Sequence, residues 1–365
     1  CLCGHQYVWS GFGFPEDDEK AEALYRKSVE QGSALGMLVA LRSGQLSKGL
    51  ERKAPMTLQE AFDRVKENAA GGDAFSQFVI GNCYFWWDFM RIQGKTGDSF
   101  SSREEFKAYL KENITQCEDW FWKAFRGGMY LAGNNLNHYY ENGDEDIVSP
   151  QPEKAKEIFK IGAEIGYPLH QYFYAKELEE AGNLAEARKW YRKSAEGGQR
   201  GVWYTVGEWY MNGTGGPKDE AEARYCFEQS AAQHEIGGLN ELGEWYYLGI
   251  HGYPKDPAKA FAYFSEAYEK GNNFSRPYLA RCYLEGWGTA PDYQKAYDMA
   301  WESKDRSGYT DSCYVLGRLY CEGLGVPMDI GKGVGFLLRV SAKAPEAAEE
   351  LKKYKKGLFG GWKRR

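Results

Sequence analysis

The chain has 365 residues, of which 43% are hydrophobic and 16% aromatic, so it can bury a large core. Its net charge of −6 excludes a broad basic surface for nucleic acid, and no apolar run approaches the roughly 18 residues that a membrane span requires. The charge is uneven, because residues 352–365 carry seven Lys or Arg and no acid, which leaves residues 1–351 with a net charge of −13.

The N-terminal segment from Cys1 to Tyr7 resembles the middle of a helix. We therefore interpret the chain as beginning inside a helix, as a fragment would, and we expect a cytoplasmic location. The alternative is an exported lipoprotein in which Cys1 follows a removed signal peptide.

The first predicted elements are helical and are followed by irregular insertions. Lys20-Ala21 and Tyr25 give the apolar spacing of an amphipathic helix, which closes at Gly32. A longer polar segment then replaces a regular turn at residues 43–57. A second insertion, rich in Gly, Ser and Thr, is predicted near 91–103.

The chain beyond residue 128 is built from a recurring unit. Residues 206–215, 242–249, 279–288 and 316–325 repeat a Leu-Gly-x-x-Tyr pattern with a Gly-rich end, which predicts a first helix and its stop. An Asp follows as an N-cap, and then a Lys-Ala-x-x-Tyr or Glu-Ala-x-x-Tyr stripe predicts a second helix. Closing positions lie near 32, 72, 128, 166, 198, 235, 271, 305 and 344. The sequence therefore predicts stacked helical hairpins that each pack on the next.

This combination of motifs resembles the Sel-one-like repeat family, which is related to the tetratricopeptide repeat. The resemblance covers nearly the whole chain and is strongest over 199–344. It implies an all-α fold, a right-handed superhelical solenoid of about eight to nine hairpins, which serves protein–protein contacts and has no chemistry of its own. We expect one elongated domain over 1–344, with the insertion near 91–103, and a capping helix with a basic tail over 345–365.

No motif in the sequence favours catalysis or a cofactor. The Gly-x-Gly turns never continue as Gly-Lys-Ser/Thr, so they do not predict a phosphate loop. Cys1, Cys3 and His5 lack a second ligand pair nearby, and the five histidines are scattered. The eight cysteines recur at no fixed offset, which predicts reduced thiols. We expect no enzyme activity, no metal and no cofactor.

Repeat-equivalent polar residues suggest a binding groove. By analogy with tetratricopeptide repeats, the position after the core glycine and its neighbours should line the concave surface. The expected groove residues are Asn82, His138, Tyr204, Glu208, Asn240, Glu244, Tyr247, Arg281, Tyr314, Arg318 and Glu322. Their charge runs from neutral to acidic to basic, which would orient a charged peptide. The alternative is a solvated polar face that binds nothing specific.

Two aromatic features leave alternatives open. Trp86 and Trp87 either anchor the insertion or form an exposed patch. Leu358, Phe359 and Trp362 either cap the last hairpin, with the cations of the tail against the acidic body, or help the tail reach anionic lipid or nucleic acid.

The sequence thus predicts a bacterial, non-catalytic scaffold that binds a protein or peptide of unknown identity. The alternatives are an exported or surface-attached binding factor, including an immunity-type protein, and a carbohydrate-binding or hydrolytic solenoid. We expect charge reversal of Glu208 with Glu244, or of Arg281 with Arg318, to abolish partner capture without lowering thermal stability.

Overall fold

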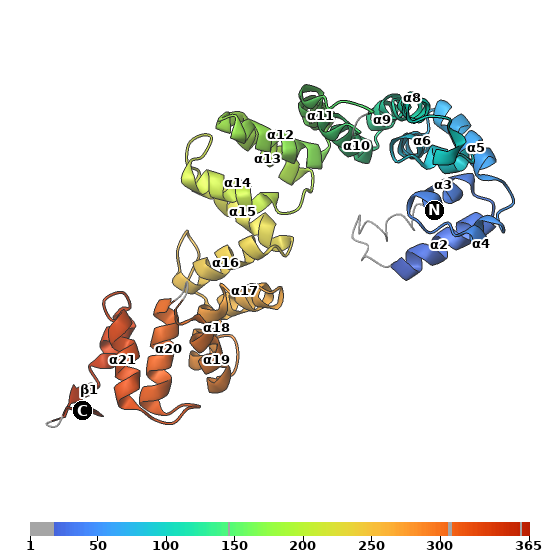
Figure 1. Ribbon diagram of the computed structural model, residues 1–365. Coiled ribbons are helices and arrows are strands. Elements are labelled where there is room, and N and C mark those ends of the chain that lie inside the picture. Colours follow the sequence, from blue (N-terminus) through green and yellow to red (C-terminus); the bar gives the residue numbers. More distant parts are fainter. Residues whose placement is uncertain (1–17, 145–146, 306–308, 358–359) are drawn as a thin grey trace. The chain divides into compact units, whose positions relative to one another are not determined.

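The computed structural model describes residues 18–144, 147–305, 309–357 and 360–365. Consecutive helices lie side by side along each part of the chain (Figure 1). The chain divides into two compact units, Cys1–Tyr174 (unit 1) and Ala175–Arg365 (unit 2), and each has its own packed core. The predicted all-α solenoid of consecutive helix pairs is confirmed.

Unit 1 contains regular helix pairs and three additional short helices. Its elements are α2 (Asp18–Glu30), α3 (Ala34–Arg42), α4 (Lys48–Glu51), α5 (Leu58–Ala70), α6 (Ala74–Phe85), α7 (Asp88–Ile92), the 3₁₀ turn η2 (Gly97–Ser99), α8 (Arg103–Ile114), α9 (Gln116–Arg126), α10 (Tyr130–Asn142) and α11 (Pro152–Ile165). The helix α12 (Pro168–Glu180) contains the boundary between the units.

Unit 2 is more regular, as its stronger sequence repeat predicts. Its helices are α13 (Leu184–Glu196), α14 (Val202–Asn212), α15 (Glu220–Ala232), α16 (Ile236–Leu248), α17 (Pro257–Glu269), α18 (Arg276–Glu285), α19 (Tyr293–Ser303), α20 (Tyr309–Glu322), α21 (Ile330–Val340) and α22 (Pro345–Leu351). We call the helices that carry the Leu-Gly core position A helices (α6, α10, α14, α16, α18 and α20) and their hairpin partners B helices; in α18 an alanine, Ala280, replaces the glycine.

In α14 and α16, the core glycine makes room for an aromatic ring of the B helix. A Cβ on Gly207 of α14 would lie 2.7 Å from the ring of Phe227 on α15. A Cβ on Gly243 of α16 would lie equally close to Phe264 on α17. Both rings are buried, so the repeated glycine is required by close helix packing rather than by backbone flexibility.

The turns between the paired helices use the chemistry that the sequence predicts. The helix α14 ends at Gly213, whose φ of 76° is a left-handed conformation that glycine adopts without strain. The helix α15 begins after Asp219, whose side chain accepts hydrogen bonds from two backbone N–H groups in the first turn. Asp256, Asp292 and Asp329 cap their helices in the same way.

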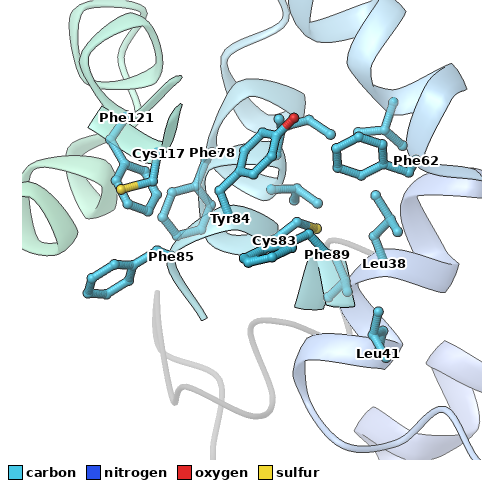
Figure 2. Packing of buried hydrophobic residues seen from close by; sticks show 14 of the residues in the cluster. Leu38, Leu41, Phe62, Phe78, Cys83, Tyr84, Phe85, Phe89, Cys117 and Phe121 are labelled. Atoms are coloured by element: carbon cyan, nitrogen blue, oxygen red, sulfur yellow. The ribbon is translucent and has the colours of Figure 1, made fainter. Parts of the chain in front are cut away.

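The insertion in unit 1 is more ordered than its polar sequence suggests. The predicted insertion near 91–103 contains the end of α7, the η2 turn and the start of α8, joined by short irregular links. The core beside them gathers Phe78 and Phe85 of α6 around Phe121 of α9, with ring centroids 6.2 and 5.9 Å from Phe121 (Figure 2). This unit therefore keeps the A–B helix contact although the sequence between the two helices is longer.

The end of unit 2 contains the expected helix, but the basic segment after it is not a simple tail. The helix α22 stops at Leu351, and a β-hairpin follows with strands β1 (Tyr354–Lys356) and β2 (Trp362–Arg364). Tyr354 and Trp362 pack with the hydrophobic cluster around α20 and α21, so they help to cover the end of the last helical hairpin. Leu358 and Phe359, which we also expected to form the cap, lie outside the described residues.

The described cysteines agree with the interpretation of reduced core thiols. Six of them, at 83, 117, 226, 282, 313 and 321, are buried and unpaired. Burial raises the pKa of the Cys282 thiol to about 12, so it is protonated and poorly nucleophilic at neutral pH. Cys1, Cys3 and His5 lie outside the described residues.

Candidate functional site

The eleven predicted groove residues all lie on A helices, but in two separate groups. Asn82 and His138 lie on α6 and α10 of unit 1. The other nine lie on α14, α16, α18 and α20 of unit 2. The structure therefore provides two local surfaces, and each is described by its own contacts.

In unit 1, the two predicted residues contact their neighbours across α6 and α10. The Asn82 Oδ1 atom accepts a hydrogen bond of 2.7 Å from the side-chain amide of Asn135. His138 is exposed and stacks on the indole of Trp86, with ring centroids 6.0 Å apart. The Arg42 guanidinium lies 5.1 Å from the Trp86 ring, so this exposed tryptophan forms part of a mixed aromatic and cationic surface.

Trp87 has a different role from Trp86. Its φ of 65° is unusual for a bulky residue and costs on the order of 1–3 kcal/mol. Its indole N–H donates a 3.0 Å hydrogen bond to Asp144, and its ring meets the edge of Phe106 on α8. These contacts favour the first alternative for this residue, an anchor for the insertion.

In unit 2, the acidic part of the row carries charge that no ion pair among the described residues neutralises. Glu208 on α14 is exposed, while Glu241 and Glu244 on α16 are partly exposed. Burial raises the pKa of the Glu241 carboxyl, and the negative charges of Glu244 and Glu208 raise it further, whereas His251 has the opposite effect. We call these three residues the carboxylate cluster.

Tyrosines lie directly beside the carboxylate cluster. The Tyr204 hydroxyl donates a 3.2 Å hydrogen bond to Glu208, and the Tyr278 hydroxyl donates a 3.4 Å bond to Glu244. Asn240, also in the predicted row, accepts a hydrogen bond of 2.9 Å from Ser275. The cluster thus combines negative charge with aromatic surface on α14, α16 and α18.

The basic part of the row is used inside the protein. The side chain of Arg281 on α18 is only 11% exposed and donates to Asp311 of α20 at 3.0 Å and to Glu346 of α22 at 3.3 Å. Tyr247 of α16 is buried and donates to the same Asp311 oxygen at 2.7 Å. Because its charge is paired with two carboxylates, Arg281 offers no free cation to a partner.

Arg318 on α20 is also held by internal partners. Its guanidinium forms ion pairs with Glu322 at 2.5 Å and with Glu285 at 3.5 Å. It also donates a 3.0 Å hydrogen bond to the hydroxyl of the buried Tyr314. Reversing Arg281 would place a carboxylate beside Asp311, so the expectation that the arginine pair can be reversed without loss of stability does not hold in this geometry.

Sequence reasoning missed several members of these networks. Glu241 could have been found, because Glu241 and Glu244 are three residues apart and face the same side of a helix. Asp311 and Glu346 lie outside the Leu-Gly-x-x-Tyr motif, and only the packing of α18, α20 and α22 places them beside Arg281. No sequence pattern links residues that are 65 positions apart.

Metal-ligating side chains do not gather within the described ranges. No group of three metal-ligating side chains occurs among those residues. His170, the most deeply buried histidine described, packs among Phe125, Phe159 and Tyr167. Neither of its ring nitrogens has a hydrogen-bond partner, so it is part of the core.

The repeat motifs are matched by a family model for the Sel1 repeat. Seven matches cover residues 2–33, 126–167, 171–199, 204–234, 237–272, 278–300 and 310–341. The chain belongs to the Sel1 repeat family. Between 33 and 126, the region that contains both insertions, no repeat is matched.

Solved structures with similar folds include repeat proteins of bacterial origin. A Sel1 repeat protein from Oxalobacter formigenes is 19% identical, with 96% of this chain and 93% of that chain covered and a TM-score of 0.49. A protective antigen of uropathogenic Escherichia coli is 19% identical, with 96% and 79% covered and a TM-score of 0.44. Part of a TPR repeat-containing protein from Cytophaga hutchinsonii is 16% identical, with 67% and 98% covered and a TM-score of 0.36. No curated protein sequence matches the chain.

The Sel1 repeat fold is typical of scaffolds for protein interaction. Within the described ranges, the helices are too short or too polar for any of them to traverse a lipid bilayer.

Proposed function

We propose that this protein is a non-catalytic scaffold whose unit 2 holds a cationic segment of a partner protein against the carboxylate cluster. The observation that carries the proposal is the uncompensated negative charge of Glu208, Glu241 and Glu244 on neighbouring A helices. A Lys or Arg from a partner would relieve their mutual repulsion.

The neighbouring side chains favour a peptide over a simple ion. Tyr204 and Tyr278 line the cluster and provide apolar area with few rotatable bonds. Aromatic side chains beside carboxylates suit the alkyl stem and the charged head of lysine or arginine. The paired arginines at α18 and α20 leave no free basic patch on the row, so the segment we expect is basic rather than of mixed charge.

The test is capture of partner proteins by the full chain and by a variant with Glu208, Glu241 and Glu244 changed to Gln. A matched control changes the exposed Glu164, Glu180 and Glu269 to Gln, which removes the same charge elsewhere. Proteins retained by the wild type should be identified by mass spectrometry and then tested as purified peptides.

The proposal requires that the cluster variant loses the retained partner while the control keeps it. The cluster variant should be at least as stable as the wild type, because repulsion is removed. If both variants retain the same proteins equally, the cluster is a solvated polar face and the proposal is wrong.

A further inference from the structure

The β-hairpin after α22 presents cations that no carboxylate of the described chain neutralises. Lys355 of β1 lies directly opposite Lys363 of β2 in the hairpin register, and both are exposed. Neither forms an ion pair with a described residue. Arg364, next along β2, is also exposed, but it lies opposite Tyr354 and therefore projects from the other face of the hairpin. We call Lys355 and Lys363 the hairpin cations.

The hairpin is held in one orientation, so these cations have a defined direction. Tyr354 is 3% exposed and packs with Trp362 against the cluster around α20 and α21. Because side chains alternate between the two faces of a strand, Lys355 and Lys363 project from the opposite, outward face. The backbone N–H of Arg365 donates to Lys353 at 2.8 Å, which extends the pairing beyond the two strands.

The two basic residues before the hairpin, unlike the hairpin cations, form ion pairs with nearby carboxylates. Lys352 pairs with Glu349 at 2.5 Å, and Lys353 pairs with Glu350 at 2.7 Å. We expected the cations of the C-terminal segment to lie against the acidic body of the protein. Among the ion pairs of the described residues in this segment, only those of Lys352 and Lys353 agree with that expectation. The hairpin cations lie beyond this internal pairing.

Like charges directly opposite each other weaken a strand pair, and a two-stranded hairpin has little stability to spare. If the hairpin only capped the last helices, Thr or Glu in place of one of these lysines would give a hairpin that is at least as stable. We propose that the outward face of this hairpin is a second binding surface, which takes an acidic segment of a protein. This surface is independent of the carboxylate cluster.

Charge and burial favour a protein segment over an anionic membrane or a nucleic acid. Residues 1–351 have a net charge of −13, and the sequence pI is about 5.6, so an extended polyanion would meet repulsion around the hairpin. Stable membrane attachment needs a hydrophobic anchor in addition to a few cations. Among the described residues of the hairpin, Tyr354 and Trp362 pack with the core cluster, so neither is presented as that anchor.

The experiment measures fluorescence anisotropy of a labelled tetra-glutamate peptide, which is short enough to contact the hairpin alone, with the full chain. The hairpin variant changes Lys355 and Lys363 to Gln. Its matched control changes the exposed Lys160 and Lys270 to Gln, which removes equal charge from other surfaces. Parallel measurements use vesicles of three parts phosphatidylcholine to one part phosphatidylserine, and a single-stranded DNA oligonucleotide.

We expect the wild type and the control to bind the peptide, and the hairpin variant to bind at least about tenfold more weakly at low salt. The melting temperature of the hairpin variant should equal or exceed that of the wild type, since repulsion between Lys355 and Lys363 is removed. Equal binding by the hairpin variant, or equal loss in the control, would overturn the proposal. Hairpin-dependent binding to the vesicles or the oligonucleotide that is tighter than binding to the peptide would also overturn it.

Discussion

Removing the Arg281 side chain tests the buried ion-pair network of unit 2. Arg281 and Asp311 are 11% and 16% exposed, and Tyr247 donates to the same Asp311 oxygen. In the Arg281→Met variant, the tyrosine hydroxyl is the side-chain partner that Asp311 keeps among the described residues, for a largely buried charge. Breaking a buried ion pair in this way costs about 3–5 kcal/mol of unfolding free energy.

The structure also predicts how this loss is distributed. Glu346 is 49% exposed, so water replaces the lost contact, and Glu346→Gln should cost under about 1 kcal/mol. The double variant Arg281→Met with Asp311→Asn removes both buried charges and should recover most of the loss. The exposed Arg52, changed to Met, is the control and should stay within about 0.5 kcal/mol of wild type.

The assay is equilibrium urea unfolding followed by circular dichroism and tryptophan fluorescence. For a unit of this size, the Arg281→Met loss corresponds to a decrease of about 10 °C in melting temperature. If Arg281→Met unfolds like the wild type, or if the double variant is no more stable than the single one, the network does not stabilise unit 2 and the reasoning is refuted.

Three further predictions concern burial, packing and capping. Burial lowers the folded-state pKa of His170 from 6.5 to about 4, so the unfolded chain binds the proton more readily than the folded chain. The unfolding free energy should therefore fall by about 2 kcal/mol between pH 7.5 and pH 5. In urea titrations at both pH values, the His170→Leu variant should lack this part of the decrease. Gly243→Ala should cost about 1–3 kcal/mol because its Cβ would lie 2.7 Å from Phe264, and a variant as stable as the wild type by thermal melting would contradict the packing argument. Asp219→Ala should cost about 1 kcal/mol by removing the N-cap of α15, whereas Asp219→Ser should retain most of the stability in the same melting assay.

The repeat pattern determined the fold because it encodes local chemistry. A glycine with positive φ ends one helix and an aspartate caps the next, and both interactions lie within a few residues along the chain. The small residue of the A helix and the apolar residue of the B helix also recur, as in Gly243 with Phe264 and Gly317 with Leu337, so the helix pairing could be predicted. Where the repeat is eroded, near residues 91–103, the sequence did not reveal α7, η2 and α8, because their order depends on tertiary contacts such as that of Trp87 with Asp144.

The repeat placed the candidate residues on A helices, but tertiary structure decided which of them are available. Glu208 and Arg281 occupy equivalent positions in the sequence unit, yet Glu208 is exposed and Arg281 is buried between Asp311 and Glu346. A periodic motif specifies which face of a helix a residue occupies, whereas its neighbours across helices come from distant parts of the chain. Free charge at the carboxylate cluster and paired charge at Arg281 are therefore properties of the packing and not of the repeat.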